Sequence, residues 1–402
     1  MKNQNFDMAR EITVREVRSK RERRLFVEFP NKLYRDNPYY VPPMYADELA
    51  DMDARKNPAF SYAQAKYFLA FAGDRIVGRI GAIYSTRANE RWGTHRMRFT
   101  QVDFIDDERV SAALFAAVEA FAREKGCDEI HGPLGFTDLD REGMLVEGFE
   151  EKSLFFTYYN EPYYKEHLTR LGYEKDVDWI ELNVHRTEDD SKTAELLKKL
   201  SARALKRHDL HIVTVRRNKD FTPYIERAFA LVNRAYASLY GVVPLDDVQI
   251  RHYAKKFVPM IDPDLACLVE NEGGELIAFG AAVRSLSDAF RKTGGKLFPF
   301  GWIPTLRALK HGSEINLLLI AVAPEYQGSG VNAVIIHRLL ENAWRVGIMC
   351  AETGPQLEMN DKVLDQWKIF PSRQHKRRRC FIKCIDTKEG ENANEDLHLE
   401  EA

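Results

Sequence analysis

The sequence LLLIAVAPEYQGSGVN occupies residues 317–332 and is the stretch from which the fold of this chain can be argued. Its apolar run, Leu317 to Val322, predicts a buried strand that Pro324 ends. The turn Gln327-Gly328-Ser329-Gly330 follows, and a helical pattern begins directly after it. The first N–H groups of a helix have no partner within the helix, and the helix dipole favours negative charge. The stretch therefore predicts a phosphate site, where glycine permits close approach.

The composition is that of a globular protein with a full core. The chain has 402 residues, 45% hydrophobic and 30% charged, and this length predicts two or three domains. A formal net charge of −2 gives no overall attraction to nucleic acid or to an anionic membrane. Residues 1–24 lack the apolar core of a secretory signal, and no apolar stretch approaches the ~20 residues that cross a bilayer. We therefore expect a cytoplasmic protein without a membrane span.

Five cysteines, at positions 127, 267, 350, 380 and 384, are too sparse for a disulfide framework and fit a reducing compartment. Cys380 and Cys384 lie near His375, but no second pair completes a set of four metal ligands. We therefore predict no metal site.

The chain contains two copies of one pattern. Residues 67–82 and 265–283 each predict a hairpin with a glycine-containing turn, and each hairpin is followed by a strand, a helix, a glycine, a strand leading to Gly-Pro, a helix and a last strand. Duplication explains this shared order better than two unrelated domains do. The strands and helices after the hairpin are 99–105, 110–125, 162–170 and 179–184 in the first half, and 317–322, the helix carrying Ile336, 360–369 and 380–385 in the second.

The two halves predict two domains. We place the first at residues 1–185 and the second at 210–386, joined by the charged segment 186–209 with a linking helix near 194–205. Residues 387–402 are acidic and poor in apolar side chains, a composition typical of a disordered tail.

The glycine turn resembles motif A of the GNAT family, the acyl-CoA-dependent N-acyltransferases. That motif reads Gln/Arg-x-x-Gly-x-Gly/Ala; Gln327 and Gly330 match it, whereas Asn332 departs at the last position. Over about residues 10–385 the chain is also similar to a group of bacterial proteins with two GNAT-like halves. The segments that carry this similarity are Phe29-Pro30, Leu33-Tyr34, residues 40–43, Asn57-Pro58, residues 77–80, Gly132-Pro133, residues 147–149 and residues 158–164.

The resemblance implies an α/β (α+β) fold: two tandem GNAT-like domains with mixed, mostly antiparallel sheets flanked by helices. It also implies an acyl-CoA co-substrate, most simply acetyl-CoA. The strand at Ile320, Ala321 and Val322 would pair with the pantetheine arm, and one of its N–H groups would stabilise the oxyanion. The alternative is a turn whose glycines serve main-chain geometry alone. The N–H groups that would hold the pyrophosphate belong to Gln327, Gly328, Ser329, Gly330, Val331 and Asn332.

The equivalent stretch of the first half, DFIDDER at residues 103–109, contains no glycine. Asp106, Asp107 and Glu108 lie at its helix start, where carboxylates satisfy the helix end and would repel a pyrophosphate. We therefore expect the first half to bind no CoA and to shape the acceptor side.

Acyl transfer to an amine also needs a group that accepts the amine proton. Glu352, in the predicted strand after Gly347, is the candidate base, and Asn360 is the second catalytic candidate. An ordinary solvated or salt-bridged glutamate is the simpler interpretation of Glu352. The family's usual proton donor, a tyrosine in the following helix, has no counterpart in residues 360–369. Tyr163 and Tyr164 stand at the corresponding place of the first half, where we expect them to pack.

Two further segments allow more than one interpretation. Residues 373–379, RQHKRRR, predict a solvated edge, a contact with a phosphate or acidic acceptor, or a nucleic-acid contact, although aromatic residues that stack on bases are missing there. Residues 296–309, KLFPFGWIPTLRAL, fall where GNAT folds accept an insertion. They are expected to pack between the halves, or else to line an apolar groove for an acceptor or acyl chain.

Taken together, these patterns predict CoA-dependent N-acyl transfer by the second half, with a small-molecule or peptide amine as the acceptor. FemABX-like aminoacyl transfer from a charged tRNA, with residues 373–379 as the RNA contact, is one alternative. A non-catalytic acyl-CoA-binding protein is the other, suggested by the absent tyrosine and by Asn332.

Overall fold

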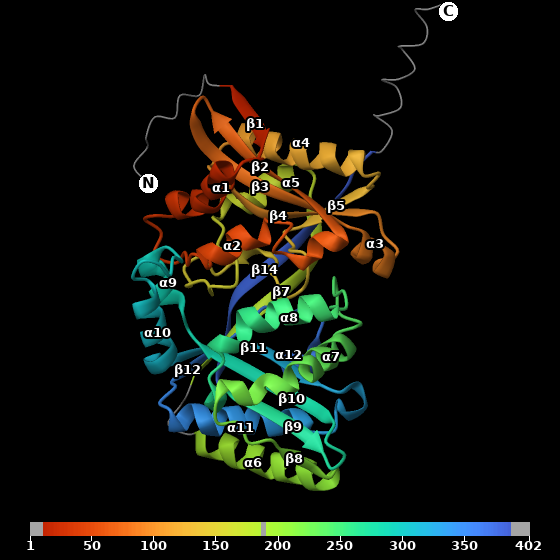
Figure 1. Ribbon diagram of the computed structural model, residues 1–402, viewed down its shortest axis with the longest axis vertical. Coiled ribbons are helices and arrows are strands. Elements are labelled where there is room, and N and C mark those ends of the chain that lie inside the picture. Colours follow the sequence, from red (N-terminus) through yellow and green to blue (C-terminus); the bar gives the residue numbers. More distant parts are fainter. Residues whose placement is uncertain (1–10, 186–189, 387–402) are drawn as a thin grey trace, which may run out of the picture. The chain divides into compact units, whose positions relative to one another are not determined.

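The structure, a computed structural model, describes residues 11–185 and 190–386. The chain forms two compact units, each a mixed sheet flanked by helices (Figure 1). Unit 1 contains the chain up to Asp178 and again from Arg378, and unit 2 contains Trp179–Arg377. The predicted class, two tandem α/β domains, is confirmed. The units divide within strands near both ends of unit 2, whereas the sequence suggested a boundary after residue 185.

Unit 1 follows the predicted order of elements. Its strands run β1-β2-β3-β4-β5 along the sheet, all antiparallel except the parallel pair β4–β5. The strands are β1 (Ile12–Glu16), β2 (Ala63–Ala72), β3 (Arg75–Ser85), β4 (Arg96–Phe104), β5 (Glu129–Gly132) and β6 (Met144–Glu147). The helices are α1 (Lys20–Leu33), α2 (Tyr45–Asp51), α3 (Thr86–Trp92), α4 (Glu108–Glu124) and α5 (Tyr163–Arg170).

Unit 2 repeats this order. Its strands run β8-β9-β10-β11-β12, and β11–β12 is again the parallel pair. The strands are β8 (Leu210–Ile212), β9 (Ala266–Asn271), β10 (Leu276–Arg284), β11 (Glu314–Val322), β12 (Cys350–Thr353) and β13 (Gln356–Leu357). The helices are α6 (Asp190–Arg207), α7 (Ile225–Ala235), α8 (Asp247–Phe257), α9 (Ser287–Thr293), α10 (Trp302–His311), α11 (Val331–Arg345) and α12 (Asp361–Asp365).

Helix α11 packs closely on the sheet of unit 2, with α6 beside it (Figure 1). The close approach requires a glycine in β10, because a Cβ at Gly280 would lie 2.3 Å from Ile335 Cγ2. On α11 the apolar side chains recur at helical spacing, and Val331, Val334 and Ile335 are buried. This packing fixes where α11 begins, and its first residues are those of the predicted phosphate site.

Both units have a register shift in the strand that precedes the long helix, which is α4 in unit 1 and α11 in unit 2. The register between β3 and β4 shifts between Arg79 and Gly81, and the register between β10 and β11 shifts between Ala281 and Ala282. In each case the extra residue lies on the second strand, as in a β-bulge. In unit 1 the bulge includes Gln101, a non-glycine residue at φ 45°. A bulge at the same place in both sheets supports the duplication that the sequence pattern indicates.

Two long strands connect the units by an exchange. β7 (Glu174–His185) begins in unit 1, but its residues Asn183–His185 pair with β12 of unit 2. β14 (Ser372–Cys384) begins in unit 2, but its residues Phe381–Cys384 pair with β5 of unit 1. The end of the second half therefore completes the sheet of the first unit.

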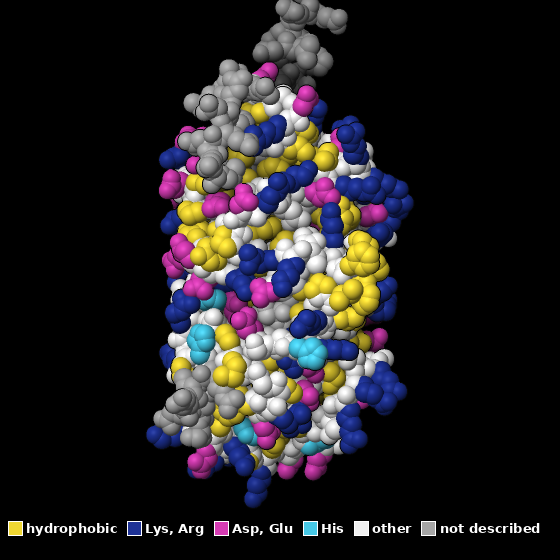
Figure 2. Space-filling model, turned by 90° about the vertical axis from the view of Figure 1, so that its left-hand side faces the viewer, with side chains coloured by type: hydrophobic (Ala, Val, Ile, Leu, Met, Phe, Trp, Pro, Cys, Tyr) yellow, Lys and Arg dark blue, Asp and Glu magenta, His cyan; other side chains and the backbone are white. Residues whose placement is uncertain are grey.

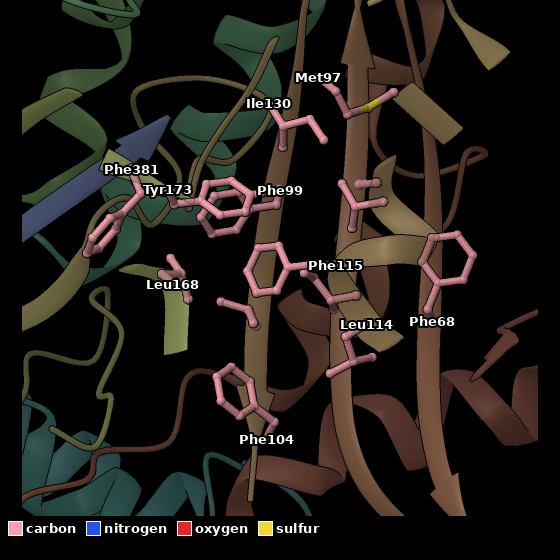
Figure 3. Close-up of a cluster of buried hydrophobic side chains, with 14 of the residues drawn as sticks. Phe68, Met97, Phe99, Phe104, Leu114, Phe115, Ile130, Leu168, Tyr173 and Phe381 are labelled. Atoms are coloured by element: carbon pink, nitrogen blue, oxygen red, sulfur yellow. The ribbon is translucent and has the colours of Figure 1, made fainter. Parts of the chain in front are cut away.

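Phe381 shows how far this exchange reaches into the core of unit 1. Its side chain, on β14, belongs to the same buried cluster as Phe99, Phe115 and Tyr173 (Figure 3). The ring of Tyr173 lies 5.8 Å from that of Phe99 and 5.0 Å from that of Phe115, so the cluster is closely packed. The separate core of unit 2 is formed by β9, β10, β11 and α11.

Two predicted boundaries differ from the structure. The last strand was expected at 380–385 but starts at Ser372, because side chains of the charged run are buried in alternation with exposed ones and neutralised by carboxylates. The helix expected at 360–369 is the five-residue α12. The helix expected near 194–205 is present as α6, but it lies within unit 2 and packs on α11. The predicted tail, 387–402, lies outside the described residues.

The exchange predicts that a substitution near the C-terminus destabilises the N-terminal unit. Phe381 is 2% exposed, so Phe381→Ala should lower the free energy of unfolding of unit 1 by about 3–5 kcal/mol. Amide hydrogen exchange should speed up in β4 and β5 and stay unchanged in β9 and β10. Ile369→Ala, at a side chain 38% exposed, serves as the control and should cost less than about 1 kcal/mol. If Phe381→Ala speeds up amide hydrogen exchange only in unit 2, the assignment of β14 to the sheet of unit 1 is contradicted.

Candidate functional site

The strands β11 and β12 diverge in unit 2, and this leaves part of β11 unpaired on one side. The last register pair is Leu317 with Thr353, after which Gly354 N–H still donates to Leu317 O at 3.3 Å. β11 continues to Val322, paired only with β10. Residues 318–322 of β11 therefore present an open edge.

The direction of the main-chain groups on this edge follows from one hydrogen bond. Ala323 N–H donates to Ile277 O on β10 at 2.8 Å. Because hydrogen-bonding direction alternates along a strand, Ala321 also faces β10, and Ile320 and Val322 face the open edge. Two side chains agree with this assignment: Tyr236 Oη donates to Ile320 O at 2.8 Å, and Gln327 Nε2 donates to Val322 O at 3.3 Å. Within the described residues, the N–H groups of Ile320 and Val322 have no recorded acceptor.

The glycine turn continues this edge into the helix. Gly328 and Gly330 have φ values of 74° and 92°, which only glycine adopts without strain, and α11 begins at Val331. Gln327 N–H and Ser329 N–H each donate to carbonyls of the turn at 3.3 Å. Hydrogen bonds of the described chain include none donated by the N–H groups of Gly328, Gly330, Val331 and Asn332. Val331 is fully buried, so the turn presents the N–H groups of Gly328, Gly330 and Asn332 to an anion.

Asn332 makes one side-chain contact. Its Nδ2 donates to Gln366 Oε1 at 3.5 Å, which links the first turn of α11 to the residue that ends α12. The main-chain N–H of Asn332 donates no recorded hydrogen bond within the described residues. The departure from motif A thus changes the side chain at this position and leaves the N–H group in place.

In unit 1 the corresponding edge is closed. Ile105 N–H donates to Val77 O at 3.0 Å, which makes Phe104 the counterpart of Val322. Phe104 N–H donates to the hydroxyl of Tyr164 at 2.8 Å, and Phe104 O accepts the hydroxyl of Tyr163 at 2.5 Å. Burial raises the pKa of both tyrosines, so their hydroxyls stay protonated. These tyrosines were expected only to pack, and they also occupy the strand edge.

The acidic helix start of unit 1 behaves as the sequence suggested. The carboxylate of Asp107 accepts the N–H of Arg109 at 3.0 Å and caps α4. The Arg109 side chain also holds the pKa of Asp107 below its usual value. Asp106 lies 3.0 Å from His167, and Glu108 forms an ion pair with Arg170. The helix end that would face a phosphate already holds a carboxylate.

Glu352 belongs to a buried charged cluster in unit 2. Its carboxylate bonds to the ammonium of Lys376 and lies 3.2 Å from His375 Nε2. Lys376 Nζ is also 2.9 Å from Glu181 Oε2, and both of these side chains are fully buried, whereas that of Glu352 is 17% exposed. Glu352 is therefore the member of the cluster that solvent or a substrate reaches. We name Glu181, Glu352, His375 and Lys376 the ion cluster.

The cluster resembles a cation site in which a lysine takes the place of the metal. Glu181, Glu352 and His375 have ligand atoms within 4.8 Å of one another. The ammonium of Lys376 bonds to both carboxylates, so it already supplies the positive charge that two buried carboxylates require. His375 joins this cluster and not Cys380 or Cys384; Cys380 lies instead near His131 and Asp176 of unit 1.

Asn316 lies next to the ion cluster. It pairs in register with Glu352 across β11 and β12, so both side chains project from the same face of the sheet. Its carboxamide oxygen is buried and accepts no hydrogen bond from the described chain.

Asn360 bonds through its main chain: its carbonyl accepts Val363 N–H and Leu364 N–H at the start of α12. No hydrogen bond of its carboxamide is recorded among the described residues.

Tyr236 is a functional candidate that sequence reasoning missed. It follows α7, far in sequence from the glycine turn, and its hydroxyl lies on the carbonyl of Ile320. A phenol thus stands beside the strand edge although α12 carries none. Only the packing of α7 against β10 and β11 brings it there, so no local sequence signal could have identified it.

The basic run of residues 373–379 is not a solvated edge. Lys376 and Arg378 are fully buried. Arg378 Nη2 donates to Thr157 Oγ1 at 2.9 Å, and Arg379 Nε donates to Asp178 Oδ1 at 2.8 Å. Arg377 pairs with Glu358 at 2.8 Å. Lys376 and Arg378 are buried, and Arg377 and Arg379 form ion pairs, so the solvated edge expected here is wrong and these four cations are engaged within the protein, whereas Arg373 is exposed.

Unit 1 contains its own polar interior, which the sequence did not reveal. Arg79 and Asp103 form a buried ion pair of 2.7 Å, and Tyr34 Oη donates to Asp103 Oδ1 at 3.0 Å. Burial raises the pKa of Asp138 to about 6, and it raises the pKa of Glu142 as well. These carboxyl groups are neutral more often than exposed ones near physiological pH.

Each unit sets a parallel strand pair and a bulge within a mixed sheet, and unit 2 adds the glycine turn. This arrangement is the GNAT fold in tandem. A solved tandem GNAT protein from the clavulanic acid biosynthesis pathway aligns with 93% of this chain and 98% of its own at a TM-score of 0.54, with 12% identity. The fold that the resemblance implied is confirmed.

Two curated proteins are similar in sequence along most of the chain. Protein YghO of Escherichia coli (strain K12) is 28% identical over 378 residues, which are 92% of this chain and 95% of that protein. The bacterial ceramide synthase of Caulobacter vibrioides (strain NA1000 / CB15N) is 26% identical over 304 residues, 75% of this chain and 77% of that protein. No family model matches the chain.

The ion cluster predicts a large and position-specific effect of losing Lys376. Lys376→Met leaves two carboxylates buried without their cation and should lower the free energy of unfolding by about 3–5 kcal/mol. The matched control is Lys383→Met on the same strand, whose ion pair with Glu119 has side chains 25% and 16% exposed. That change should cost less than about 1 kcal/mol. Chemical denaturation followed by tryptophan fluorescence measures both, and equal losses would contradict the assignment.

Proposed function

We propose that the protein is an acyl-CoA-dependent N-acyltransferase whose donor site lies in unit 2. One observation carries this proposal: the open N–H groups of Ile320 and Val322 run directly into the N–H groups of the glycine turn. An extended amide chain pairs with such an edge as an added strand, and a pyrophosphate suits the start of α11. CoA has both parts in that order. The closed edge and the capped helix of unit 1 favour a single donor site per chain.

The residues of this site have distinct proposed roles. Ile320 and Val322 bind the pantetheine arm, with Ala321 between them facing β10. Gln327, Gly328, Ser329, Gly330, Val331 and Asn332 form the phosphate loop. We assign to one N–H of the β11 edge the stabilisation of the oxyanion that forms from the thioester oxygen.

The chemistry is nucleophilic substitution at the thioester. The amine nitrogen bonds to the acyl carbon, the C–S bond breaks, and the thiolate leaves as CoA. Glu352, the accessible member of the ion cluster, accepts the amine proton directly or through water. Tyr236 is placed to protonate the leaving thiolate, and the free carboxamide of Asn360 is a candidate contact for the acceptor.

The length of the acyl chain separates two forms of this proposal. Acetyl-CoA and a small amine are the simplest substrates. The similarity to a protein named as a ceramide synthase favours a longer acyl chain and a lipid amine. Turnover of acetyl-CoA and palmitoyl-CoA against spermidine and sphinganine, followed by thiol release, distinguishes the two. The aminoacyl-tRNA alternative has lost its support, because the basic run is engaged in internal ion pairs. Tight CoA binding without turnover on any amine would favour the non-catalytic alternative.

The phosphate loop is tested by adding one negative charge. Gln327 is exposed and its Nε2 donates to Val322 O at 3.3 Å, so Gln327→Glu adds a negative charge and removes this hydrogen bond, and we expect the Kd for CoA to rise about tenfold. Isothermal titration should show one CoA per wild-type chain. Gln374→Glu, at an exposed position of β14, is the matched control and should bind CoA normally. Unaltered affinity in Gln327→Glu argues against the loop, and two sites per chain argue against a closed unit 1.

The role of Glu352 is tested by kinetics. Glu352→Gln should lower kcat/KM by about 10²- to 10⁴-fold while leaving the Kd for CoA unchanged. The deficit should shrink as pH rises, because more of the acceptor amine is then neutral and needs no base. Glu358→Gln, which alters the ion pair with Arg377, is the control and should remain active. A deficit that is constant with pH indicates a structural role for Glu352.

A further inference from the structure

The insertion between β10 and β11 exposes a group of large apolar side chains. Phe298 is 81% exposed and Phe300 73%, and three side chains of α10 are also exposed: Ile303 at 50%, Leu306 at 47% and Trp302 at 45%. The sequence suggested packing between the halves or an apolar groove for an acceptor or acyl chain, and within unit 2 these side chains are exposed. Figure 2 shows hydrophobic side chains gathered at the surface on the face that carries α9 and α10. We name these five residues the apolar tip.

The tip is held in this exposed position by the main chain. Gly295 N–H donates to Phe290 O at 3.0 Å, and Trp302 N–H donates to Leu297 O at 2.8 Å, so the connection between α9 and α10 is a closed turn. Gly301 is required there, since a Cβ would lie 1.8 Å from Lys296 O. Phe290, below the turn, is fully buried and anchors it. Phe298 and Phe300 therefore project from a rigid support.

Positive charge surrounds the tip. Residues 287–311 contain five Lys or Arg and one acidic residue, Asp288, although the whole chain has a net charge of −2. On α10, Arg307 and Lys310 follow Ile303 at spacings of four and seven residues, which places them on its exposed face. Arg307 and Lys310, with Arg291 and Lys292 at the end of α9, are exposed, and none of these four enters a recorded ion pair among the described residues.

We propose that the apolar tip docks this protein on an anionic lipid bilayer. Aromatic and aliphatic side chains would enter the interfacial layer, and the flanking lysines and arginines would lie on acidic headgroups. No helix within the described ranges is long and apolar enough to cross a membrane, so the attachment is peripheral. The proposal concerns location and is independent of the proposed donor site.

The same features argue against a second copy of the chain as the occupant. In a two-fold symmetric dimer the patch would meet itself, and two basic surfaces would face each other. A protein partner would need pockets for two projecting phenylalanines, whereas a fluid bilayer accommodates them without a preformed shape. The charge and the projecting form of the tip both suit a lipid surface.

Vesicle sedimentation of the full chain tests this proposal. The wild type should sediment with phosphatidylcholine vesicles that contain phosphatidylglycerol, less with phosphatidylcholine alone, and less at high salt. Phe298→Ser with Phe300→Ser should lower the partition coefficient at least about tenfold. The control is Val248→Ser with Leu196→Ser, at side chains 55% and 46% exposed on other helices, and should bind as the wild type does.

A charge variant adds an independent arm. Arg307→Gln with Lys310→Gln should weaken binding to the anionic vesicles several-fold and abolish most of its salt dependence. Lys20→Gln with Arg21→Gln, exposed at the start of α1, should have no effect. The proposal is overturned if the wild type fails to sediment, or if the double serine variant binds undiminished. It is also overturned if sedimentation velocity shows an oligomer for the wild type and a monomer for the double serine variant. The tip would then be an interface between copies of the chain.

Discussion

Where two parallel strands diverge, the longer strand keeps a row of main-chain N–H and C=O groups without strand partners. The two units differ in which groups bond to this row. In unit 1 the hydroxyls of Tyr163 and Tyr164 satisfy Phe104, and a carboxylate caps the helix that follows. In unit 2 the equivalent N–H groups remain open, and a glycine turn replaces the carboxylate. The same backbone geometry thus has both its N–H and its C=O groups bonded by side chains in one copy, whereas in the other Tyr236 and Gln327 bond only the carbonyls and the N–H groups stay open.

The strand exchange gives each unit a strand segment from the other half of the sequence. β7 and β14 each start in one unit and end in the other, so neither sheet is complete without residues from both halves of the sequence. Phe381 contributes to the stability of unit 1, because its side chain fills the core of that unit. The neighbouring strand β5 lies some 250 residues earlier in the sequence. The exchange also places Lys376 and Arg378, two residues apart, in different units.

Buried charge is the second constraint. The carboxylates of Glu181 and Glu352 tolerate burial because Lys376 lies between them, and this arrangement fixes the part of β14 nearest the proposed site. The glutamate proposed as the base is therefore oriented by its ion pair with Lys376, and His375 lies beside it. That orientation places Glu352 beside Asn316, where the strands diverge.

The sequence by itself determined the order of strands and helices, the duplication and the glycine turn before α11, because hydrophobic periodicity and glycine positions are local properties. Tertiary structure decided the rest. It showed that RQHKRRR is a strand, since the carboxylates that neutralise it come from Asp178, Glu181 and Glu352, distant in the chain. It put Tyr236 on the open edge through the packing of α7, and it left Phe298 and Phe300 exposed where an apolar run suggested burial. Each of these outcomes depends on which residues meet across the fold, and no spacing along the chain encodes that.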